Sequence, residues 1–158
     1  MSTPQHVEAD LGWALGRVTR AHLRTAELVV AGLPGGPRGY QVLVEAARGG
    51  PGNQLALAQK LGVDRTVMTY LLDELERAEL VRRQPDPADR RARQIVITEV
   101  GRERLCELER KLRGAEEELL RPLEPAERVT LRALLARLAT DAGGPSDACQ
   151  VAEELKRC

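Results

Sequence analysis

Two groups of side chains in this sequence bring hydroxyl and guanidinium groups together at close spacing. The first group lies at the start of a predicted helix and consists of Arg65, Thr66, Thr69 and Tyr70. The second lies in and just after a predicted turn and consists of Arg90, Arg91 and Arg93. Hydroxyl and guanidinium groups bind phosphate oxygens and the edges of bases. We therefore expect both groups to contribute to one DNA-contacting surface.

Two predicted helices separated by a tight turn position the first group. Asn53 is suited to cap a helix that continues through Leu61, and Gly62 is suited to end it. Asp64 can cap the next helix, which we expect over residues 65–79. Its buried face is expected to consist of Val67, Met68, Leu71, Leu72 and Leu75. This arrangement is typical of a helix-turn-helix, whose second helix enters the major groove.

A predicted β-hairpin positions the second group. Residues 80–84 and 93–98 have the composition of short strands, and residues 85–90 between them are rich in Pro and Asp, which favour turns. From Arg82 to Arg93 there are five Arg and two Asp, an excess of three positive charges in a neutral chain. We therefore expect the hairpin to have a basic, polar tip.

Amphipathic helices are expected on both sides of this core. Residues 6–31 repeat apolar positions at steps of three and four, and the Gly- and Pro-rich residues 32–37 are expected to form a flexible connection to a short helix over 39–47. A leucine stripe runs from Leu105 to Leu119, and a last helix is expected over 125–140. These stripes exceed what one small domain can cover, so they predict a helical dimer interface.

The composition limits the fold class. The chain has 158 residues, 42% hydrophobic and 30% charged, and its 24 Lys and Arg balance 24 Asp and Glu. With no Phe, one Trp and two Tyr, the core depends on Leu, Val and Ala, which suit packed helices better than a β-sandwich. No charge-free segment approaches the roughly 20 apolar residues of a membrane helix, and residues 1–10 do not resemble a secretory signal. We expect a cytoplasmic protein without membrane contact.

The order of these motifs resembles the winged helix-turn-helix core of the MarR family of bacterial transcription regulators. The resemblance covers residues 40–101, and its most specific parts are Leu-Asp-Glu-Leu-Glu at 72–76 and Asp-Arg-Arg at 89–91. It implies a mainly α fold with a two-stranded β-wing, flanked by N- and C-terminal helices that form a dimerisation element. The expected domains are an N-terminal dimerisation helix with its linker (1–36), a DNA-binding lobe (37–98), C-terminal dimerisation helices (99–142) and a tail (143–158).

The resemblance also implies partners and roles. It implies a homodimer that binds a pseudo-palindromic operator in double-stranded DNA, with the second helix in the major groove and the wing over the minor groove. In the family's pattern Asp89 orients Arg91 for insertion into a narrow minor groove, whose negative potential attracts a guanidinium group. Arg90 and Arg93 are then expected to bind phosphates.

Four further positions bear on the same surface. By analogy with the family, Asp73 braces the wing or the domain interface. Tyr70 stands where family members often carry Arg, and a phenol cannot grip guanine with two hydrogen bonds, so the base preference is left open. Arg82 and Arg83 lie at the base of the first strand, where ordinary surface salt bridges are as good an expectation as phosphate contacts.

Family members usually respond to small anionic or phenolic compounds bound between the dimerisation helices and the DNA-binding lobe, so the resemblance implies a repressor that such an effector releases. Trp13 and His22, on the first helix, are candidate pocket residues, with plain packing as their alternative role. Some members respond to oxidants through cysteine. The redox candidates are therefore Cys106, Cys149 and Cys158, although we expect Cys106 to be a buried small hydrophobe.

Other classes of function are less well supported by the motifs. An enzyme is not expected, because the sequence has no GxxxxGK[ST] loop, no HExxH motif and no paired histidine and nucleophile. No cofactor or metal is expected, since the cysteines form no CxxC pair and His6 and His22 lie on nearly opposite helix faces. A winged helix that binds only other proteins stays an alternative, because the second helix also carries several acidic residues.

Overall fold

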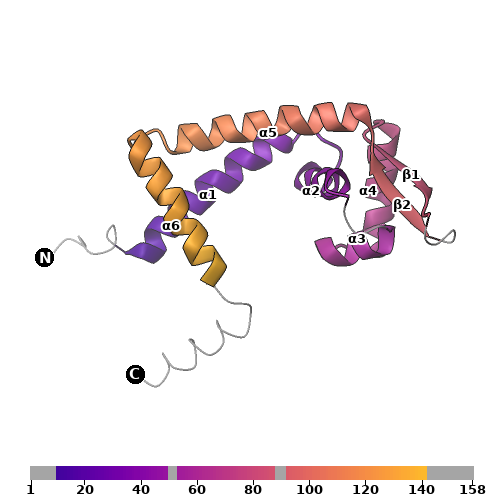
Figure 1. Cartoon of the computed structure of the whole chain (residues 1–158), viewed down its shortest axis with the longest axis horizontal. Coiled ribbons are helices and arrows are strands. Elements are labelled where there is room, and N and C mark those ends of the chain that lie inside the picture. The colour runs from indigo at the N-terminus through magenta and orange to yellow at the C-terminus, as the bar shows by residue number, and fades with distance from the viewer. Residues whose placement is uncertain (1–9, 50–52, 88–91, 142–158) are drawn as a thin grey trace, which may run out of the picture. The chain divides into compact units, whose positions relative to one another are not determined.

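The computed structural model describes residues 10–49, 53–87 and 92–141, which form six helices and two strands (Figure 1). The elements are α1 (Leu11–Val30), α2 (Gly36–Ala47), α3 (Gln54–Leu61), α4 (Arg65–Arg77), β1 (Val81–Pro85), β2 (Arg93–Ile97), α5 (Glu99–Leu119) and α6 (Pro125–Asp141). The chain divides into two compact units, Met1–Leu119 and Leu120–Cys158, and α6 is the helix of the second unit. The predicted mainly α, winged helix-turn-helix fold is confirmed.

Side-chain caps set where several helices begin. The Asp10 carboxylate accepts a hydrogen bond from the Gly12 amide (2.7 Å), and Asn53 accepts one from the Ala56 amide (2.9 Å). At the start of α5 the Thr98 hydroxyl accepts a hydrogen bond from the amide of the third residue of the helix, at 2.9 Å. Such caps satisfy amides that have no partner inside the helix. The predicted Asn53 cap of α3 is confirmed.

Several helix boundaries differ from the prediction. Helix α1 begins at Leu11, after its Asp10 cap, instead of at residue 6, and glycine-like backbone conformations explain the differences at α2 and α4. Helix α2 begins at Gly36 instead of Gly39, because Gly35 adopts a left-handed conformation (φ 73°) and Pro37 fits the first turn of a helix. The expected flexible connection over 32–37 is therefore wrong, and Leu33 within it is buried. Helix α4 ends at Arg77 because Glu79 takes a positive φ of 60°.

The core of the first unit is built mainly from Leu and Val, as the composition predicts, but the predicted Ala contributes only Ala58, and Met68, Ile95 and Ile97 supply the rest. Its fully buried large side chains are Leu43, Met68, Leu72, Leu75, Leu108, Val42 and Val81, contributed by α2, α4, α5 and β1. Val67, predicted to be buried with them, is 56% exposed. At about 100° per residue it lies roughly 90° from the middle of the buried stripe of α4, beyond the reach of the core.

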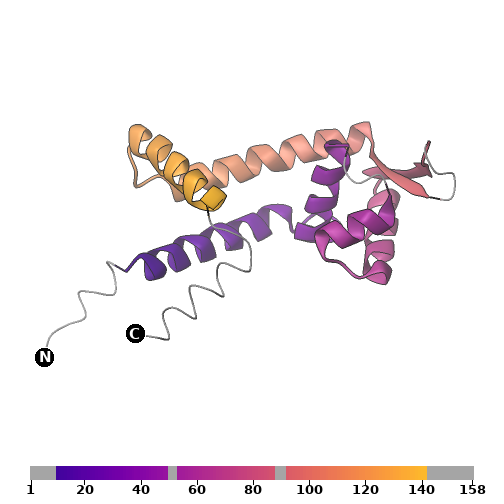
Figure 2. The ribbon, with the colours of Figure 1, turned by 60° about the horizontal axis from the view of Figure 1, so that its bottom comes forward.

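The strands β1 and β2 form an antiparallel hairpin in which Val81 pairs with Ile97 and Arg83 with Ile95. The predicted hairpin is confirmed, and one face of it joins the core through Val81, Ile95 and Ile97. Helix α1 lies along α5, away from the hairpin end of α5 (Figures 1 and 2). Among the described residues, no helix has the length and apolarity required to cross a membrane.

The first turn of α5 packs directly on the backbone that joins α4 to β1. The Thr98 amide donates to the Leu80 carbonyl oxygen (3.1 Å), and the Thr98 hydroxyl lies against the same connection. A Cβ at Gly101 would overlap this carbonyl oxygen, whereas a Cβ at Gly114, further along α5, would meet no atom. Only glycine at 101 therefore lets α5 approach the wing so closely.

We expect Gly101→Ala to lower the free energy of unfolding by about 1–3 kcal/mol, because the added methyl group forces α5 away from Leu80. Gly114→Ala is the matched control in the same helix, and it should raise that free energy by up to about 1 kcal/mol through helix propensity. Urea unfolding followed by circular dichroism at one fixed protein concentration measures both. Equal stability of the two variants would contradict the close packing at Leu80.

Candidate nucleic-acid interface

Helices α3 and α4 form a helix-turn-helix whose turn is held by backbone hydrogen bonds. Gly62 supplies the left-handed residue of the turn (φ 60°), and the Val63 amide donates to the Ala58 carbonyl oxygen at 2.9 Å. The Asp64 carboxylate accepts a hydrogen bond from the Thr66 amide at 2.8 Å. Backbone hydrogen bonds of this kind hold the pKa of Asp64 below its usual value. The cap therefore keeps its negative charge at the positive end of the α4 dipole.

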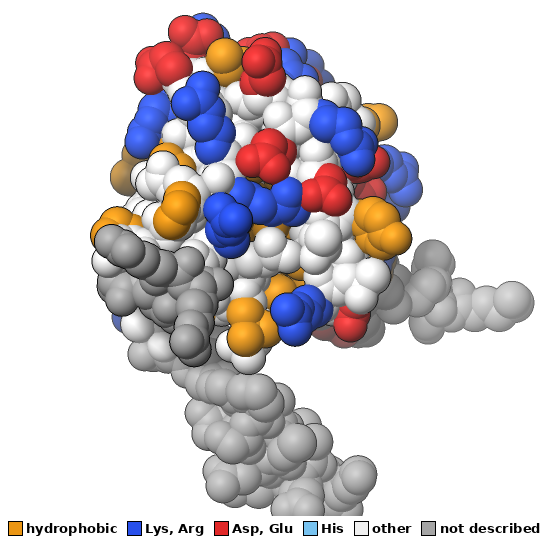
Figure 3. All heavy atoms as spheres, turned by 90° about the vertical axis from the view of Figure 1, so that its right-hand side faces the viewer, with side chains coloured by type: hydrophobic (Ala, Val, Ile, Leu, Met, Phe, Trp, Pro, Cys, Tyr) orange, Lys and Arg blue, Asp and Glu red, His pale blue; other side chains and the backbone are white. Residues whose placement is uncertain are grey.

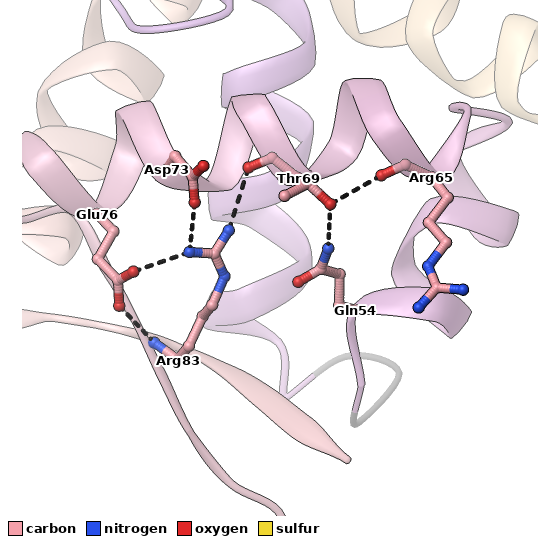
Figure 4. Close-up of polar contacts among 6 residues, drawn as sticks. All are labelled: Gln54, Arg65, Thr69, Asp73, Glu76 and Arg83. Carbon is pink, nitrogen blue, oxygen red and sulfur yellow. Dashed lines mark hydrogen bonds and ion pairs between the residues drawn. The ribbon is translucent and has the colours of Figure 1, made fainter. Parts of the chain in front are cut away.

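The residues of the first group predicted to contact DNA differ in their exposure to solvent. Arg65, Thr66 and Tyr70 lie on the exposed surface of α4, and Tyr70 is 68% exposed. Thr69 is only half-buried, and its hydroxyl is engaged in both directions (Figure 4). It donates to the Arg65 carbonyl oxygen (3.0 Å) and accepts from the Gln54 side-chain amide (2.8 Å). Thr69 thus connects α3 to α4 within the chain.

Arg83 joins β1 to α4 through three acceptors (Figure 4). Its guanidinium group lies 2.6 Å from the Asp73 carboxylate and 3.0 Å from that of Glu76, and it donates to the Thr69 carbonyl oxygen at 3.1 Å. The Arg83 backbone amide donates to the second carboxylate oxygen of Glu76 at 2.9 Å. The Arg83 Nε atom is buried and has no hydrogen-bond partner among the described residues. One side chain therefore ties the wing to the second helix.

A recess of about 350 Å³ lies where α3, α4 and the wing meet. Its lining consists of Asn53, Gln54, Leu55, Arg65, Thr69, Ala92 and Arg93. The recess brings together Arg65 from the helix group and Arg93 from the wing group, although 27 residues lie between them in the sequence (93 − 65 − 1). The tip residues Asp89, Arg90 and Arg91 lie outside the described residues.

The surface at this end of the molecule carries both signs of charge. Figure 3 looks onto the end of the first unit where α3, α4 and the wing lie, and it shows Lys and Arg side chains interspersed with Asp and Glu and with apolar patches. Two of the acids on α4, Asp73 and Glu76, are paired with Arg83. Because one guanidinium group is shared by two carboxylates, these acids are held against β1 by Arg83.

A second cavity, of about 680 Å³, lies among α1, α2 and α5. Its lining consists of His22, Leu23, Ala26, Glu27, Val30, Pro37, Tyr40, Gln41, Glu109, Leu112, Arg113 and Glu116. Burial raises the pKa of Tyr40, and the neighbouring Glu109 carboxylate adds to the effect. Of the two candidate pocket residues, the lining within the described part of the chain includes His22 but not Trp13, which is 41% exposed beneath Arg17.

Known proteins match the chain over most of its length. A family model described as the MarR family matches residues 37–92. A transcriptional regulatory protein for the hcr operon of Thauera aromatica is 30% identical over 130 residues, which are 82% of this chain and 78% of that protein. The structure of CouR from Rhodococcus jostii RHA1 bound to p-coumaroyl-CoA is 31% identical and has a TM-score of 0.62, covering 87% of this chain and 96% of that one. CouR bound to a 23-mer DNA duplex is 28% identical with a TM-score of 0.64, over 88% and 99% of the two chains.

The family model, together with a relative of 30% identity over more than two thirds of both chains, decides the family. The chain belongs to the MarR family. It is a MarR-family transcription regulator, as the motif order predicts, and the matched residues 37–92 run from α2 to the turn before β2. No group of three metal-binding side chains occurs among the residues that the structure describes in this MarR-family chain.

Sequence reasoning missed several features of this MarR-family interface. The Gln54–Thr69 hydrogen bond and the contacts of Arg83 with Glu76 and with the Thr69 carbonyl oxygen join residues between 7 and 15 positions apart, where no helix or strand period predicts a pairing. The Arg83–Asp73 ion pair, by contrast, involves a residue for which the family resemblance already implies a bracing role. The sequence did carry a signal for the contacts of Arg83, because Asp73 and Glu76 are spaced three apart and therefore share one face of α4. The sequence reasoning also placed Val67 in the core and so missed that its apolar side chain is exposed on α4.

The cysteines of this MarR-family regulator fall in different settings. Cys106 is exposed on α5, so the expectation of a buried small hydrophobe is wrong. The leucine stripe of α5 buries Leu105 and Leu108, and Cys106 follows Leu105 by about 100°, on the flank of that stripe. Cys149 and Cys158 lie outside the described residues.

We expect Arg83→Met to lower the free energy of unfolding of this MarR-family chain by about 1–2 kcal/mol, because it leaves Asp73 and Glu76 without their common partner. Amide hydrogen exchange in residues 81–97 should quicken at the same time. Arg83→Lys should restore little of the lost free energy of unfolding, since a single ammonium group cannot reach all three acceptors.

Arg82→Met is the matched control for this experiment, because the neighbouring Arg82 is exposed on the same strand. It should change the free energy of unfolding by less than about 0.5 kcal/mol. If Arg82→Met and Arg83→Met quicken hairpin exchange equally, the structural role assigned to Arg83 is wrong.

Proposed function

We propose that this regulator is a homodimeric repressor that binds a pseudo-palindromic operator and releases it when a small molecule occupies the cavity among α1, α2 and α5. The observation that carries the DNA-binding part is the recess that unites Arg65 and Arg93 beside the exposed face of α4. The 28% identity to CouR, whose structure contains a DNA duplex, supports the same function.

In this proposal the candidate residues other than Thr69 that bear on DNA binding have the following roles. Thr66 and Tyr70 enter the major groove on the N-terminal half of α4, where recognition helices contact base edges. Arg65, Arg90 and Arg93 bind phosphates, which fix the register of the protein on the duplex. Asp89 orients Arg91 for the minor groove. Asp73 orients the wing indirectly, by its ion pair with Arg83.

The dimer part of the proposal rests on apolar surface that one chain leaves open. On α1 the exposed large apolar residues include Leu11, Leu15 and Val18, and on α6 they include Val129, Leu134 and Leu138. Rows of this kind on two long helices are suited to pairing with a second copy of the chain. The functional division is then dimerisation residues 1–36 and 99–142 around a DNA-binding lobe at 37–98, with a tail at 143–158.

The effector part of the proposal rests on the charges of the cavity. Its lining offers one guanidinium group, Arg113, against three carboxylates, those of Glu27, Glu109 and Glu116. This balance disfavours a strongly anionic ligand and favours a neutral phenol, which Tyr40 and Gln41 can meet with hydrogen bonds. CouR, whose structure contains p-coumaroyl-CoA, supports a phenolic ring. The proposed regulator acts in the cytoplasm, where its operator lies, and catalyses no reaction.

The DNA-binding proposal is tested by footprinting the purified protein on the DNA beside its own gene over a series of salt concentrations. We expect a protected palindrome with half-sites about 10 bp apart, and an affinity that falls steeply as salt rises. Arg91→Ala should weaken binding by more than about twofold, because a guanidinium group in the minor groove is lost. Protection of no sequence at low salt, with specific capture of a protein instead, would favour the interaction-module alternative.

The effector proposal predicts that 4-hydroxybenzamide, a neutral phenol, raises the melting temperature of the protein and releases the operator, whereas 4-hydroxybenzoate does so less. Tyr40→Phe should weaken this response about fivefold to tenfold, the value of one hydrogen bond. Tyr70→Phe, at the other tyrosine of the chain, is the matched control and should leave the melting response unchanged. A stronger response to the benzoate, or an unchanged one in Tyr40→Phe, would contradict the assignment.

A further inference from the structure

Helix α4 presents two exposed apolar side chains near its start. Val67 is 56% exposed and Tyr70 is 68% exposed, and residues three apart are neighbours on a helix surface. The other large apolar side chains of α4, those of Met68, Leu71, Leu72 and Leu75, are buried. Folding of the unit therefore does not account for an apolar side chain at position 67.

The opposite edge of α4 is already occupied by contacts inside the chain. The Thr69 hydroxyl is shared by Gln54 and the Arg65 carbonyl oxygen, and Asp73 and Glu76 are both held by Arg83 (Figure 4). These polar groups position α3 and the wing against α4. The side chains left to meet a ligand on the N-terminal half of α4 are therefore Arg65, Thr66, Val67 and Tyr70, and two of these four are largely apolar.

We propose that Val67, with Tyr70 beside it, reads the 5-methyl group of thymine in the major groove. This inference rests on the proposed operator binding and names its base specificity. Thymine is the one base whose major-groove edge carries a methyl group, and apolar side chains are what contact it. Val67 is the third residue of α4, on the part of a recognition helix that reaches base edges.

The neighbouring side chains suit the same assignment. Thr66 precedes Val67 on the exposed face and can hydrogen-bond an adjacent base or contact a methyl group through its own methyl. Arg65 lies in the recess with Arg93, to the other side of the helix start. Neither valine nor tyrosine can grip guanine with two hydrogen bonds, so Val67 and Tyr70 direct this part of the helix toward A·T pairs.

The test begins with selection of bound duplexes from a random-sequence pool by the full-length chain. We expect thymine at one or more symmetric positions of the enriched palindrome, and the preference at these positions should weaken with Val67→Ala. Replacing that thymine by uracil removes only the methyl group. It should lower wild-type affinity by about fourfold per half-site, the effect of burying one methyl-sized group, and leave the affinity of Val67→Ala nearly unchanged.

Val100→Ala is the matched control, because Val100 is an exposed valine on α5. It should retain the full difference between thymine and uracil, and circular dichroism should show native helicity for both variants, since both valines are largely exposed. Equal discrimination by wild type and Val67→Ala, or an enriched palindrome without thymine at positions that Val67 affects, would overturn the inference. Enrichment of no duplex would instead overturn operator binding itself.

Discussion

The placement of the wing relative to α4 depends on the guanidinium group of Arg83. A two-stranded hairpin is marginal by itself, so its direction must be set by contacts with the rest of the unit. One face of the hairpin buries Val81, Ile95 and Ile97 in the core. These apolar contacts hold the hairpin against the unit but do not set its direction. Arg83 adds direction, because a planar fork that meets two carboxylates and a carbonyl oxygen tolerates little rotation. The helix-turn-helix and the wing thus keep a defined spacing within the first unit.

Other ion pairs in the first unit bear on how a chain without net charge can be suited to a polyanion. Glu45 is buried against Lys60 at 2.6 Å, and Glu107 lies between Arg104 and Lys111, which lower its pKa to about 2. These ion pairs, with those of Arg83, engage four carboxylates and four cationic groups, so they leave the overall balance of charge unchanged. Binding of a polyanion then depends on where basic side chains lie on the surface, as Arg65 and Arg93 do in one recess, and not on net charge.

Local chemistry made most of the fold predictable from the sequence. Asn53, Gly62 and Thr98 act through neighbours within a few positions, and the hairpin follows from a turn-rich segment between apolar alternations. The features that the sequence did not predict depend on partners far away in the chain, or on a difference of a few tens of degrees in where a side chain lies around its helix. The side chain of Val67 lies just past the edge of the buried stripe, and the acceptors of Arg83 are known only once β1 is seen beside α4. Gly35 and Pro37 are predicted to interrupt helices, whereas Gly35 is the N-cap of α2 and Pro37 lies in its first turn.

Helix α2 contacts both the cavity among α1, α2 and α5 and the elements of the candidate nucleic-acid interface. Pro37, Tyr40 and Gln41 line the cavity, while the same helix packs against β2, and Glu45 near its other end is paired with Lys60 of α3. A helix of 12 residues with regular hydrogen bonds moves as a rigid body. Under the proposed effector response, a displacement at Tyr40 would reach α3 and β2 as a tilt of α2, so cavity occupancy and helix orientation would be coupled without the unfolding of any segment.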